Sequence, residues 1–347
     1  MLEIINISKD YGGFALQEIN LSVKKGEYFV LLGRSGAGKS QLLENIAGLR
    51  RADSGTLILD SVDISHEKIQ SRPVGLVYQD FALFPHLSVY DNIAYPLRMV
   101  KEKKEEIAVK VKRIAEETNI AHLLDRKPED LSGGEKQRVA VSRTLVRSPK
   151  IILLDEPMAS IDTPLRDDLR RLLRKINRQG MTILHVTHDY REAIRLADRI
   201  GVIHNGRIIQ QGTPDEVFDK PVNRFVARFA GIQNFFRVNI REENGFFVGE
   251  GRRGLAFKLP GKDYPEDGIV MLRSDDIILQ REKPGCSYNC FEGSVTEINR
   301  AENGFELFVD ARETFYVTLA IKNYRQMQPV EGEKIYLSFD SEAIRVM

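Results

Sequence analysis

A glycine-rich segment near the N-terminus has the composition and spacing of a phosphate-binding loop. It matches G-x-x-x-x-G-K-[ST] with the residues Gly33, Arg34, Ser35, Gly36, Ala37, Gly38, Lys39 and Ser40. Glycines let the backbone wrap an anion, and a helix that follows adds the positive end of its dipole. Lys39 is expected against the β and γ phosphates of a nucleotide, and the Ser40 hydroxyl on Mg²⁺. The alternative, a glycine-rich turn without a ligand, is disfavoured by the complete spacing.

Two adjacent carboxylates, Asp155 and Glu156, follow the apolar stretch Ile151–Leu154. Open α/β sheets bind ligands at the carboxyl ends of their strands, so we expect this pair near the glycine-rich loop. A metal-bound phosphate needs a hard oxygen ligand, and an attacking water needs a proton acceptor. We therefore expect Asp155 to hold Mg²⁺ and Glu156 to act as general base. Without a phosphate loop, two solvated acids at a strand end would be the simpler interpretation.

Short apolar strands that alternate with amphipathic segments are expected to position these groups, from the N-terminus to about residue 230. The candidate buried strands are Tyr28–Leu32, Val74–Tyr78, Ile151–Leu154, Thr182–Val186 and Arg199–His204. Helical periodicity is present in Gln41–Ala47 and in Lys101–Thr118, where Ile107, Val111 and Ile114 share one face. This alternation is typical of an α/β domain.

A third helical stretch begins with the motif that is most specific for a family. Its residues are Leu131, Ser132, Gly133, Gly134 and Glu135, followed by Lys136, Gln137 and Arg138. They open a helix that we expect to run to about Val146, with an N-terminus suited to an anion. Taken alone, an ordinary capped helix is the alternative. The motif resembles the signature of the ATP-binding cassette ATPases, and the resemblance covers nearly the whole chain, more loosely after Gly231.

The resemblance implies roles for three further residues, each of which would otherwise have a structural interpretation. Gln79 stands where the family has a glutamine that senses Mg²⁺ and the attacking water, and His188 where it has a histidine that contacts the γ-phosphate. Tyr11 stands where an aromatic ring stacks on adenine. The resemblance also implies that ATP lies between the phosphate loop of one chain and the signature helix of another. A head-to-tail homodimer with two ATP sites is therefore expected.

Two positions depart from the family pattern. Gln41 stands where a threonine often follows the loop serine, so a hydroxyl is lost although the backbone N–H remains. In the D-loop, Ala159-Ser160-Ile161-Asp162 replaces the usual Ser-Ala-Leu-Asp, which keeps Asp162 and displaces the hydroxyl by one position. We expect a modest change in nucleotide affinity and altered communication between the two sites.

The composition of the sequence changes after about residue 231, where short segments rich in β-branched and aromatic residues begin. The tight-turn pairs Asn244-Gly245 and Asn303-Gly304 each separate two such segments. The expected strands are Phe235–Ile240, Phe246–Val248, Phe305–Val309, Thr314–Leu319 and Lys334–Phe339. The predicted fold is thus an α/β P-loop nucleotide-binding domain at residues 1–230, with a helical signature subdomain at about 80–147. An all-β OB-like regulatory domain at 235–347 follows it.

The overall composition excludes several classes of protein. Of the 347 residues, 51 are Lys or Arg and 50 are Asp or Glu, and this balance argues against nucleic acid as a partner. No apolar run approaches the roughly 18 residues that cross a bilayer, and no secretory signal is visible, so a cytoplasmic chain is expected. Its two cysteines, Cys286 and Cys290, are expected to be free thiols rather than zinc ligands.

Further segments are similar to bacterial and archaeal import ATPases that carry a C-terminal regulatory domain. They are Phe81–Val89, Asn205-Gly206 and Gln211-Gly212-Thr213-Pro214. This resemblance implies integral membrane permease subunits as partners, with a coupling helix received by about residues 81–97, where Phe81, Leu83, Phe84 and Leu87 are otherwise core residues. It also implies, indirectly, a substrate-binding protein and a peripheral position on the cytoplasmic face of the cell membrane.

The segment Phe225–Asn234 and the short C-terminal domain look similar to molybdate or tungstate import ATPases. In some of these, the C-terminal domains bind the oxyanion and hold the dimer open. Sulfate, ferric ion, sugar and polyamine importers share much of the layout and stay open as alternatives. An alternative of another class is a soluble, non-transport cassette ATPase, although these commonly carry two cassettes, coiled-coil insertions or basic surfaces, none of which the sequence indicates.

Overall fold

The computed structural model describes residues 1–159, 161–243, 245–261, 263–285, 289–301 and 304–347, except for the side chains of residues 163 and 164. Ser160, Asn244, Cys286 and Asn303, named above, lie outside the described residues. The chain has two compact units, Met1–Val217 and Phe218–Met347, here called the N-terminal unit and the C-terminal unit. The division precedes the expected one, because helix α8 (Arg224–Phe229) packs on β11 (Ile232–Glu243) of the C-terminal unit.

A six-stranded sheet with the order β10-β9-β3-β8-β7-β6 forms the centre of the N-terminal unit. All its strands are parallel except β10, which pairs with β9 antiparallel at one edge. The strands are β3 (Tyr28–Leu32), β6 (Val74–Val77), β7 (Ile151–Asp155), β8 (Thr182–Thr187), β9 (Arg199–His204) and β10 (Arg207–Gly212). Every residue of β3 and β8 is buried, as expected for central strands covered on both faces. The five strands expected from apolar runs are thereby confirmed.

The N-terminal unit also has a four-stranded antiparallel sheet, which the sequence analysis did not predict. Two of its strands precede the first helix in the sequence, and two follow it. Its order is β2-β1-β4-β5, with β1 (Leu2–Asp10), β2 (Ala15–Val23), β4 (Ser54–Leu59) and β5 (Val62–Asp63). Its signal in the sequence is a period of two: Ile19, Leu21 and Val23 are buried, and the residues between them are exposed. Side chains of this sheet, of helix α1 (Lys39–Ala47) and of the parallel strands share one apolar core.

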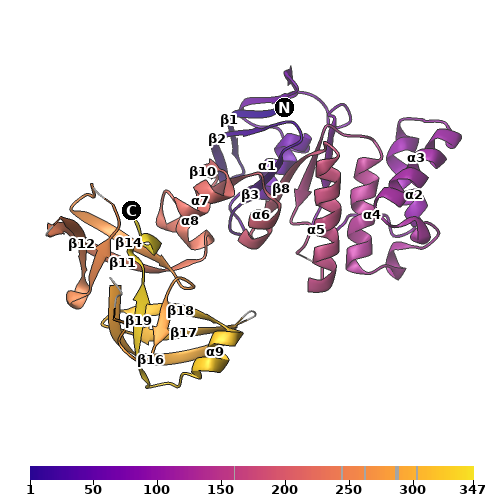
Figure 1. Cartoon of the computed structure of the whole chain (residues 1–347). Helices are drawn as coiled ribbons and strands as arrows, with labels where there is room; N and C mark the ends of the chain where they lie inside the picture. The colour runs from indigo at the N-terminus through magenta and orange to yellow at the C-terminus, as the bar shows by residue number, and fades with distance from the viewer. Residues whose placement is uncertain (160, 244, 262, 286–288, 302–303) are drawn as a thin grey trace. The chain divides into compact units, whose positions relative to one another are not determined.

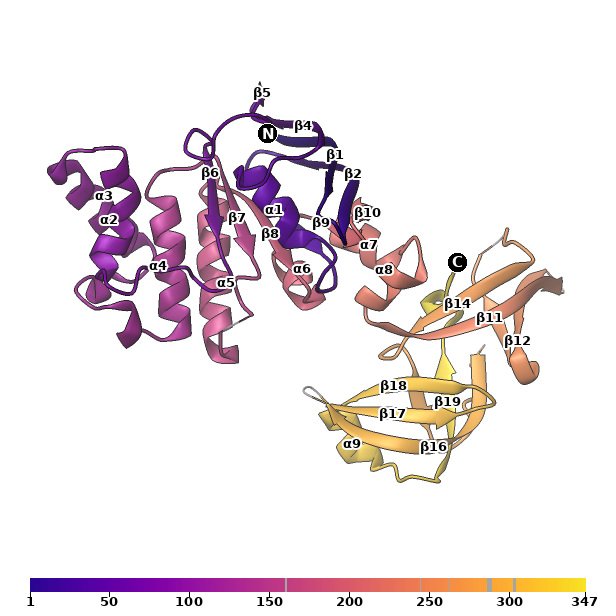
Figure 2. The ribbon, with the colours of Figure 1, turned by 180° about the vertical axis from the view of Figure 1, so that it is seen from behind.

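Three helices gather at one side of the N-terminal unit and contact one another (Figures 1 and 2). They are α2 (Val89–Met99), α3 (Lys104–Glu117) and α4 (Gly133–Leu145), within the range expected for a helical subdomain. In α3, the predicted face Ile107, Val111 and Ile114 is buried. Helices α5 (Thr163–Arg178) and α6 (Tyr190–Leu196) also belong to this unit, and the division between the units falls within α7 (Pro214–Asp219). Among the residues described, no helix has both the length and the apolarity to span a bilayer.

Strands make up most of the C-terminal unit, in two five-stranded antiparallel sheets instead of the single small barrel expected. One sheet has the order β13-β12-β11-β14-β20, and the other β15-β19-β16-β17-β18. In addition to β11, the strands of these sheets are β12 (Phe246–Gly251), β13 (Ala256–Leu259), β14 (Asp267–Arg273), β15 (Ile278–Gln280), β16 (Asn289–Ala301), β17 (Gly304–Asp310), β18 (Thr314–Ala320), β19 (Lys334–Phe339) and β20 (Arg345–Val346). A short helix, α9 (Ile321–Met327), follows β18. Both expected hairpins form, since β11 pairs with β12 and β16 with β17.

The two sheets of the C-terminal unit repeat one topology and exchange a strand. In each sheet, the first of four consecutive strands pairs with the second and with the fourth, from β11 to β14 and from β16 to β19. The fifth strand comes from the other repeat: β15 follows β14 but pairs with β19, and β20 follows β19 but pairs with β14. This exchange ties the two repeats together, and both sheets contribute to one apolar core.

Candidate nucleotide site

The carboxyl ends of four parallel strands bring most of the expected site residues to one edge of the sheet. Val77 of β6 is in register with Leu154 of β7, Asp155 of β7 with Val186 of β8, and Leu32 of β3 with Thr187 of β8. The segments that leave these strands therefore begin side by side. They carry, in the order of the sheet, Gln79, the pair Asp155 and Glu156, His188, and the glycine-rich loop. This is the edge where open α/β sheets bind ligands.

The glycine-rich loop connects β3 to α1, as the motif requires. Gly36 and Gly38 have φ angles of 79° and 103°, a backbone region that L side chains rarely adopt. A Cβ on Gly38 would also lie 2.6 Å from Cζ of Phe14, so only glycine fits there. Arg34, Ser35 and Gly36 are exposed, whereas Gly33, Ala37, Gly38 and Lys39 are buried. The loop thus presents its first half to solvent and anchors its second half in the core.

The Lys39 side chain lies across the loop with its ammonium group buried. Its Nζ donates to the carbonyl oxygens of Gly33 at 2.9 Å and of Arg34 at 3.2 Å. The same nitrogen lies 3.2 Å from Oε1 of Glu156, with the Lys39 side chain 5% exposed and that of Glu156 12% exposed. A charge pair this buried interacts strongly, because little water screens it. Lys39 therefore links the phosphate loop to the end of β7.

Ser40 and Asp155 form the second link between the loop and β7. The Ser40 hydroxyl donates to Oδ1 of Asp155 at 3.0 Å. Burial raises the pKa of the Asp155 carboxyl, and the neighbouring Glu156 charge raises it further, while Ser40 and Lys39 act in the opposite direction. The Ser40 hydroxyl and the Asp155 carboxylate thus lie side by side, at a place where burial destabilises the negative charge of the carboxylate. This is the donor set that a small hard cation such as Mg²⁺ prefers.

Glu156 lies between Lys39 and His188, which come from different segments. Its Oε2 is 2.6 Å from Nδ1 of His188, and its Oε1 faces Lys39. Glu156 has a left-handed φ of 43°, and its N–H donates to the carbonyl of Val186 at 3.0 Å. A non-glycine residue held in this region stores roughly 1 to 3 kcal/mol of strain, which the surrounding structure must over-determine. Such placement suits a carboxylate that must accept a proton at a defined position.

Gln79 and Tyr11 occupy more peripheral positions. Gln79 is exposed, two residues beyond the end of β6. Tyr11 lies in the turn between β1 and β2 and is half-buried against the apolar core of the N-terminal unit. Its hydroxyl accepts a hydrogen bond of 2.6 Å from Nδ2 of Asn45 in α1. Desolvation by burial raises the pKa of Tyr11, so its hydroxyl stays protonated at neutral pH. This bond fixes the ring next to the phosphate loop, and the sequence offered no signal for Asn45.

The signature residues are assembled separately from the phosphate loop. Ser132 caps α4 with a complete capping box: its hydroxyl accepts from the N–H of Glu135, whose carboxylate accepts from the N–H of Ser132 at 2.8 Å. Leu131 and Gly134 are buried, Gly133 and Glu135 are half-buried, and Ser132 is exposed. Gly134 allows the close approach of α5, because an added Cβ would lie 3.3 Å from Leu165. Ser132, Gly134 and Glu135 border a cavity with Arg138 and Asp168 that contains no phosphate-loop residue.

Gln41 and the retained D-loop residue Asp162 have ordinary local structure. Gln41 is half-buried in the first turn of α1, and its carbonyl accepts from Nδ2 of Asn45 at 2.7 Å. Asp162 is exposed at the N-cap of α5 with extended backbone, and its side chain makes no capping hydrogen bond. The Ser160 position lies outside the described residues, so the displaced D-loop hydroxyl stays a sequence observation.

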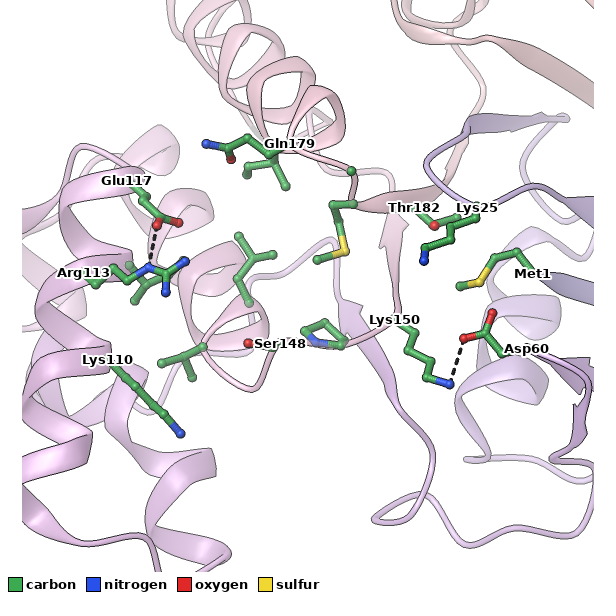
Figure 3. A pocket seen from close by; sticks show the side chains of 17 residues that line it. Met1, Lys25, Asp60, Lys110, Arg113, Glu117, Ser148, Lys150, Gln179 and Thr182 are labelled. Carbon is green, nitrogen blue, oxygen red and sulfur yellow. Dashed lines mark hydrogen bonds and ion pairs between the residues drawn. The ribbon is translucent and has the colours of Figure 1, made fainter.

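A different cavity, of about 500 Å³, opens at the amino ends of β7 and β8 (Figure 3). Arg113 pairs with Glu117 on one wall, and Lys150 pairs with Asp60 on the other. None of the expected site residues borders it. It lies at the opposite edge of the sheet from the phosphate loop. It is therefore not the nucleotide site.

Arg143 of α4 holds the backbone of a neighbouring segment in place, and the sequence analysis did not identify this residue. Its guanidinium donates to the carbonyls of Ala82 at 2.7 Å and Phe81 at 3.1 Å, two residues with left-handed φ angles. It also lies 5.4 Å from the centre of the Phe84 ring. Arg143 thereby shapes the segment that follows Gln79, and a groove here is bordered by Ala82, Phe84, Tyr95, Pro96 and Arg143. Phe81, Leu83, Phe84 and Leu87 are all half-buried, so none is a fully enclosed core residue.

Comparisons with known proteins agree with this geometry. A family model described as "ABC transporter" matches residues 16–159. The molybdate/tungstate import ATP-binding protein of Pyrococcus abyssi is 40% identical over the full length of both chains. The spermidine/putrescine import ATP-binding protein of Mesoplasma florum is 34% identical over all of this chain and 97% of that one. A solved dimeric, post-hydrolysis ATP-binding cassette bound to ADP and phosphate is 28% identical, with a TM-score of 0.56 over 62% of this chain and 99% of that one.

The similarity to curated import ATP-binding proteins thus extends from end to end, and over 62% of the chain the fold is similar to that of a solved cassette bound to ADP and phosphate. The chain belongs to the ABC transporter family, in which it is an ATP-binding and ATP-hydrolysing protein of the import type.

Proposed function

We propose that the chain is the ATPase subunit of an importer for molybdate or tungstate oxyanions. The observation that carries this proposal is the full-length identity of 40% to the Pyrococcus abyssi protein, which includes the C-terminal unit. A relative from Pyrococcus horikoshii with the same printed function is 38% identical over 100% of this chain. Polyamine import is the second candidate, because two polyamine proteins match the full chain at 34% identity. Sulfate, ferric ion and sugar import remain lesser alternatives.

Mg²⁺ is the metal that we propose at the phosphate loop, held by Ser40 and Asp155, with Gln79, two residues beyond β6, as the third proposed ligand. The two oxygens are already 3.0 Å apart, and the raised pKa of Asp155 indicates a carboxylate that a cation would stabilise. When bound, Mg²⁺ neutralises charge on the β and γ phosphates of ATP. The loop N–H groups and the Lys39 ammonium bind the same phosphates from the protein side.

Glu156 is the proposed general base for hydrolysis. Phosphate oxygens compete with its Oε1 for the Lys39 ammonium, so binding of ATP would free this carboxylate to accept a proton from the attacking water. His188 would hold the other oxygen of Glu156, at the 2.6 Å contact, and approach the γ-phosphate from the exposed side of the edge. Tyr11, held by Asn45, would stack on the adenine ring.

A head-to-tail homodimer is the proposed working form, since the phosphate loop and the signature helix are assembled separately in one chain. In that arrangement, the N-terminus of α4, with Leu131, Ser132, Gly133, Gly134 and Glu135, would close over ATP bound to the other copy. Asp162 at the start of α5 would lie near the same boundary. ATP favours the closed dimer because ADP lacks the γ-phosphate contacts.

Permease subunits are the proposed membrane partners, and the groove beside Phe84 is their proposed docking site. Its half-buried aromatic rings Phe84 and Tyr95 lie 4.6 Å apart and offer an amphipathic helix an apolar seat. The chain would then be peripheral on the cytoplasmic face of the membrane and would serve, indirectly, a substrate-binding protein. Nucleic acid is not a proposed partner, given the net charge of +1.

The C-terminal unit is proposed to regulate transport. The topology of each sheet, with its first strand between the second and the fourth, supports two OB-like modules that share their fifth strands. A chain truncated after residue 234 should keep basal hydrolysis and lose any inhibition by oxyanion.

Uptake into membrane vesicles that contain the chain with its permease tests the proposal directly. ATP-dependent uptake of labelled tungstate, competed by molybdate and not by spermidine, is the expected result. Uptake of spermidine alone would favour the polyamine alternative. A chain that never sediments with membranes or copurifies with an integral membrane protein would favour a soluble cassette ATPase instead.

A further inference from the structure

A buried polar chain links three elements beneath the nucleotide edge and takes no part in the chemistry described so far. Tyr28 begins β3, His185 lies in the middle of β8, and Glu192 lies in the first turn of α6. The Tyr28 hydroxyl is 3.1 Å from Nδ1 of His185, and Nε2 of His185 is 3.4 Å from Oε2 of Glu192. Tyr28 and His185 are fully buried, and Glu192 is 4% exposed. Polar groups this deep are costly unless they satisfy one another.

The charge states along this chain follow from its surroundings. Burial raises the pKa of Tyr28 well above its usual range, with the Glu192 charge adding to the effect, so Tyr28 stays a neutral hydroxyl. Burial alone would raise the pKa of Glu192, but His185, Thr187 and Arg170 together lower it, so Glu192 is a carboxylate. Nε2 of His185 has no hydrogen-bond partner within the described residues. The polar group that faces this nitrogen is the Glu192 carboxylate, 3.4 Å away.

The positions of these residues bracket His188. His185 precedes it by three residues, Glu192 follows it by four, and the contact between them joins the two ends of an eight-residue segment. Inside this segment, the N–H of Asp189 donates to Oγ1 of Thr187 at 3.1 Å, and Asp189 caps α6. The His188 side chain itself is 55% exposed, and its Nδ1 lies 2.6 Å from Oε2 of Glu156. The placement of His188 therefore depends on how firmly the backbone on either side is held.

We propose that Glu192 and His185 are positioning residues for hydrolysis, which act by closing the 185–192 segment so that His188 meets Glu156. Neither residue touches the phosphate loop. Loss of the Glu192 carboxylate leaves a buried ring nitrogen uncompensated and releases the first turn of α6 from β8. A displacement of His188 by about 1 Å is enough to reduce the rate about 10- to 100-fold, because the reacting groups must be held at near-attack distances. This inference rests on the proposed role of His188.

A double-mutant cycle separates positioning from general stability. Glu192→Gln should lower kcat for ATP about 10- to 100-fold with KM within about twofold, since phosphate binding by Lys39 is untouched. His188→Ala should lower kcat at least as much. Combined in one full-length chain, the two changes should cost no more than His188→Ala alone, because Glu192 acts only through His188. Losses that multiply in the double variant would overturn the proposal.

Two further variants keep the test decisive. Tyr28→Phe removes one hydroxyl with little change in shape and should give a smaller kcat loss, also absent in the His188→Ala background. Glu27→Gln is the matched control, because Glu27 is a buried glutamate (7% exposed) that pairs with Arg199 at 3.5 Å outside the 185–192 segment. It should lower Tm without lowering kcat. If Glu192→Gln and Tyr28→Phe behave like this control, the inference fails while the role of His188 stands. If His188→Ala itself keeps the parental kcat, both the role of His188 and the inference fail.

Discussion

The nucleotide edge of the N-terminal unit and the core of the C-terminal unit gather opposite kinds of side chain. At the edge, Lys39, Ser40, Asp155, Glu156 and His188 arrive from three segments and contact one another at 2.6 to 3.2 Å. In the C-terminal core, both sheets contribute phenylalanines, with ring centres 4.6 to 6.5 Å apart; these are Phe236, Phe257, Phe291, Phe315 and Phe339. We expect the first cluster to set the rate of ATP hydrolysis and the second the stability of its unit, so substitutions in the two should have separable effects.

The sharpest test of this contrast is Glu156→Gln. Turnover should fall about 100- to 10,000-fold, the usual contribution of a positioned general base, while ATP still binds through the loop and Lys39. Steady-state hydrolysis and a nucleotide-binding titration on one preparation measure both. Glu297→Gln, an exposed glutamate of β16, should leave turnover unchanged. Parental turnover in Glu156→Gln would remove Glu156 from its proposed role.

The opposite result is expected for Phe257→Ala in the C-terminal core. Phe257 is fully buried and packs on Phe236 at 5.1 Å, so the free energy of unfolding of this unit should fall by about 3 to 5 kcal/mol. Chemical denaturation followed by a probe in the C-terminal unit measures the change. Val330→Ala, at a side chain that is 62% exposed, should stay within about 0.5 kcal/mol. Loss of basal hydrolysis at temperatures where Phe257→Ala is folded would contradict the separation.

A smaller effect, on affinity, is expected for Lys39→Ala. Removing a charge-assisted contact to phosphate costs about 1.5 to 3 kcal/mol, so the Kd for ATP should rise roughly 10- to 100-fold. Calorimetric titration with ATP measures this, and circular dichroism checks that the loop variant is folded. Lys25→Ala, at the cavity on the opposite edge, serves as control. An unchanged Kd for Lys39→Ala would show that phosphates bind elsewhere.

The smallest effect is a difference in pH dependence at Asp155. Because its pKa is raised in the folded protein, the folded state holds this proton more tightly than the unfolded state does. Stability should therefore fall as pH rises from the usual value of 3.8 into the raised range, and Asp155→Asn should remove that loss. Melting curves between pH 4 and 7 without Mg²⁺, compared between parent and variant, isolate the contribution. Addition of Mg²⁺ should stabilise only the parent; equal stabilisation of both would argue against this metal site.

Much of the site could be read from the sequence because each part is local. The glycine spacing of residues 33–40 defines a loop whatever surrounds it, and the apolar run before Asp155 defines a strand end. The capping box of Ser132 and Glu135 is likewise a pattern within four residues. That the loop and Asp155 gather at one edge follows from the rule that parallel strands present their carboxyl ends together.

Other features depend on residues that are distant in the sequence and had no usable signal. The strands β15 and β20 have three and two residues, too few to show a period, so their exchange between the two repeats is visible only in the pairing. Asn45 and Arg143 are ordinary helix residues until the fold brings Tyr11 and the Phe81–Phe84 segment to them. His185 is one more apolar-strand residue in the sequence, and only the fold brings it within 3.4 Å of Glu192.

The sequence by itself determined which chemical groups the protein has and which local shapes hold them: a phosphate loop, a strand that ends in two carboxylates, and a capped signature helix. Tertiary structure alone decided that Glu156 stands between Lys39 and His188, and that Ser40 faces Asp155. The physical reason is the distance along the sequence between the residues that interact. Backbone turns and caps depend on neighbours within a few residues, whereas contacts between charged side chains depend on strand register and burial, which the whole sheet sets.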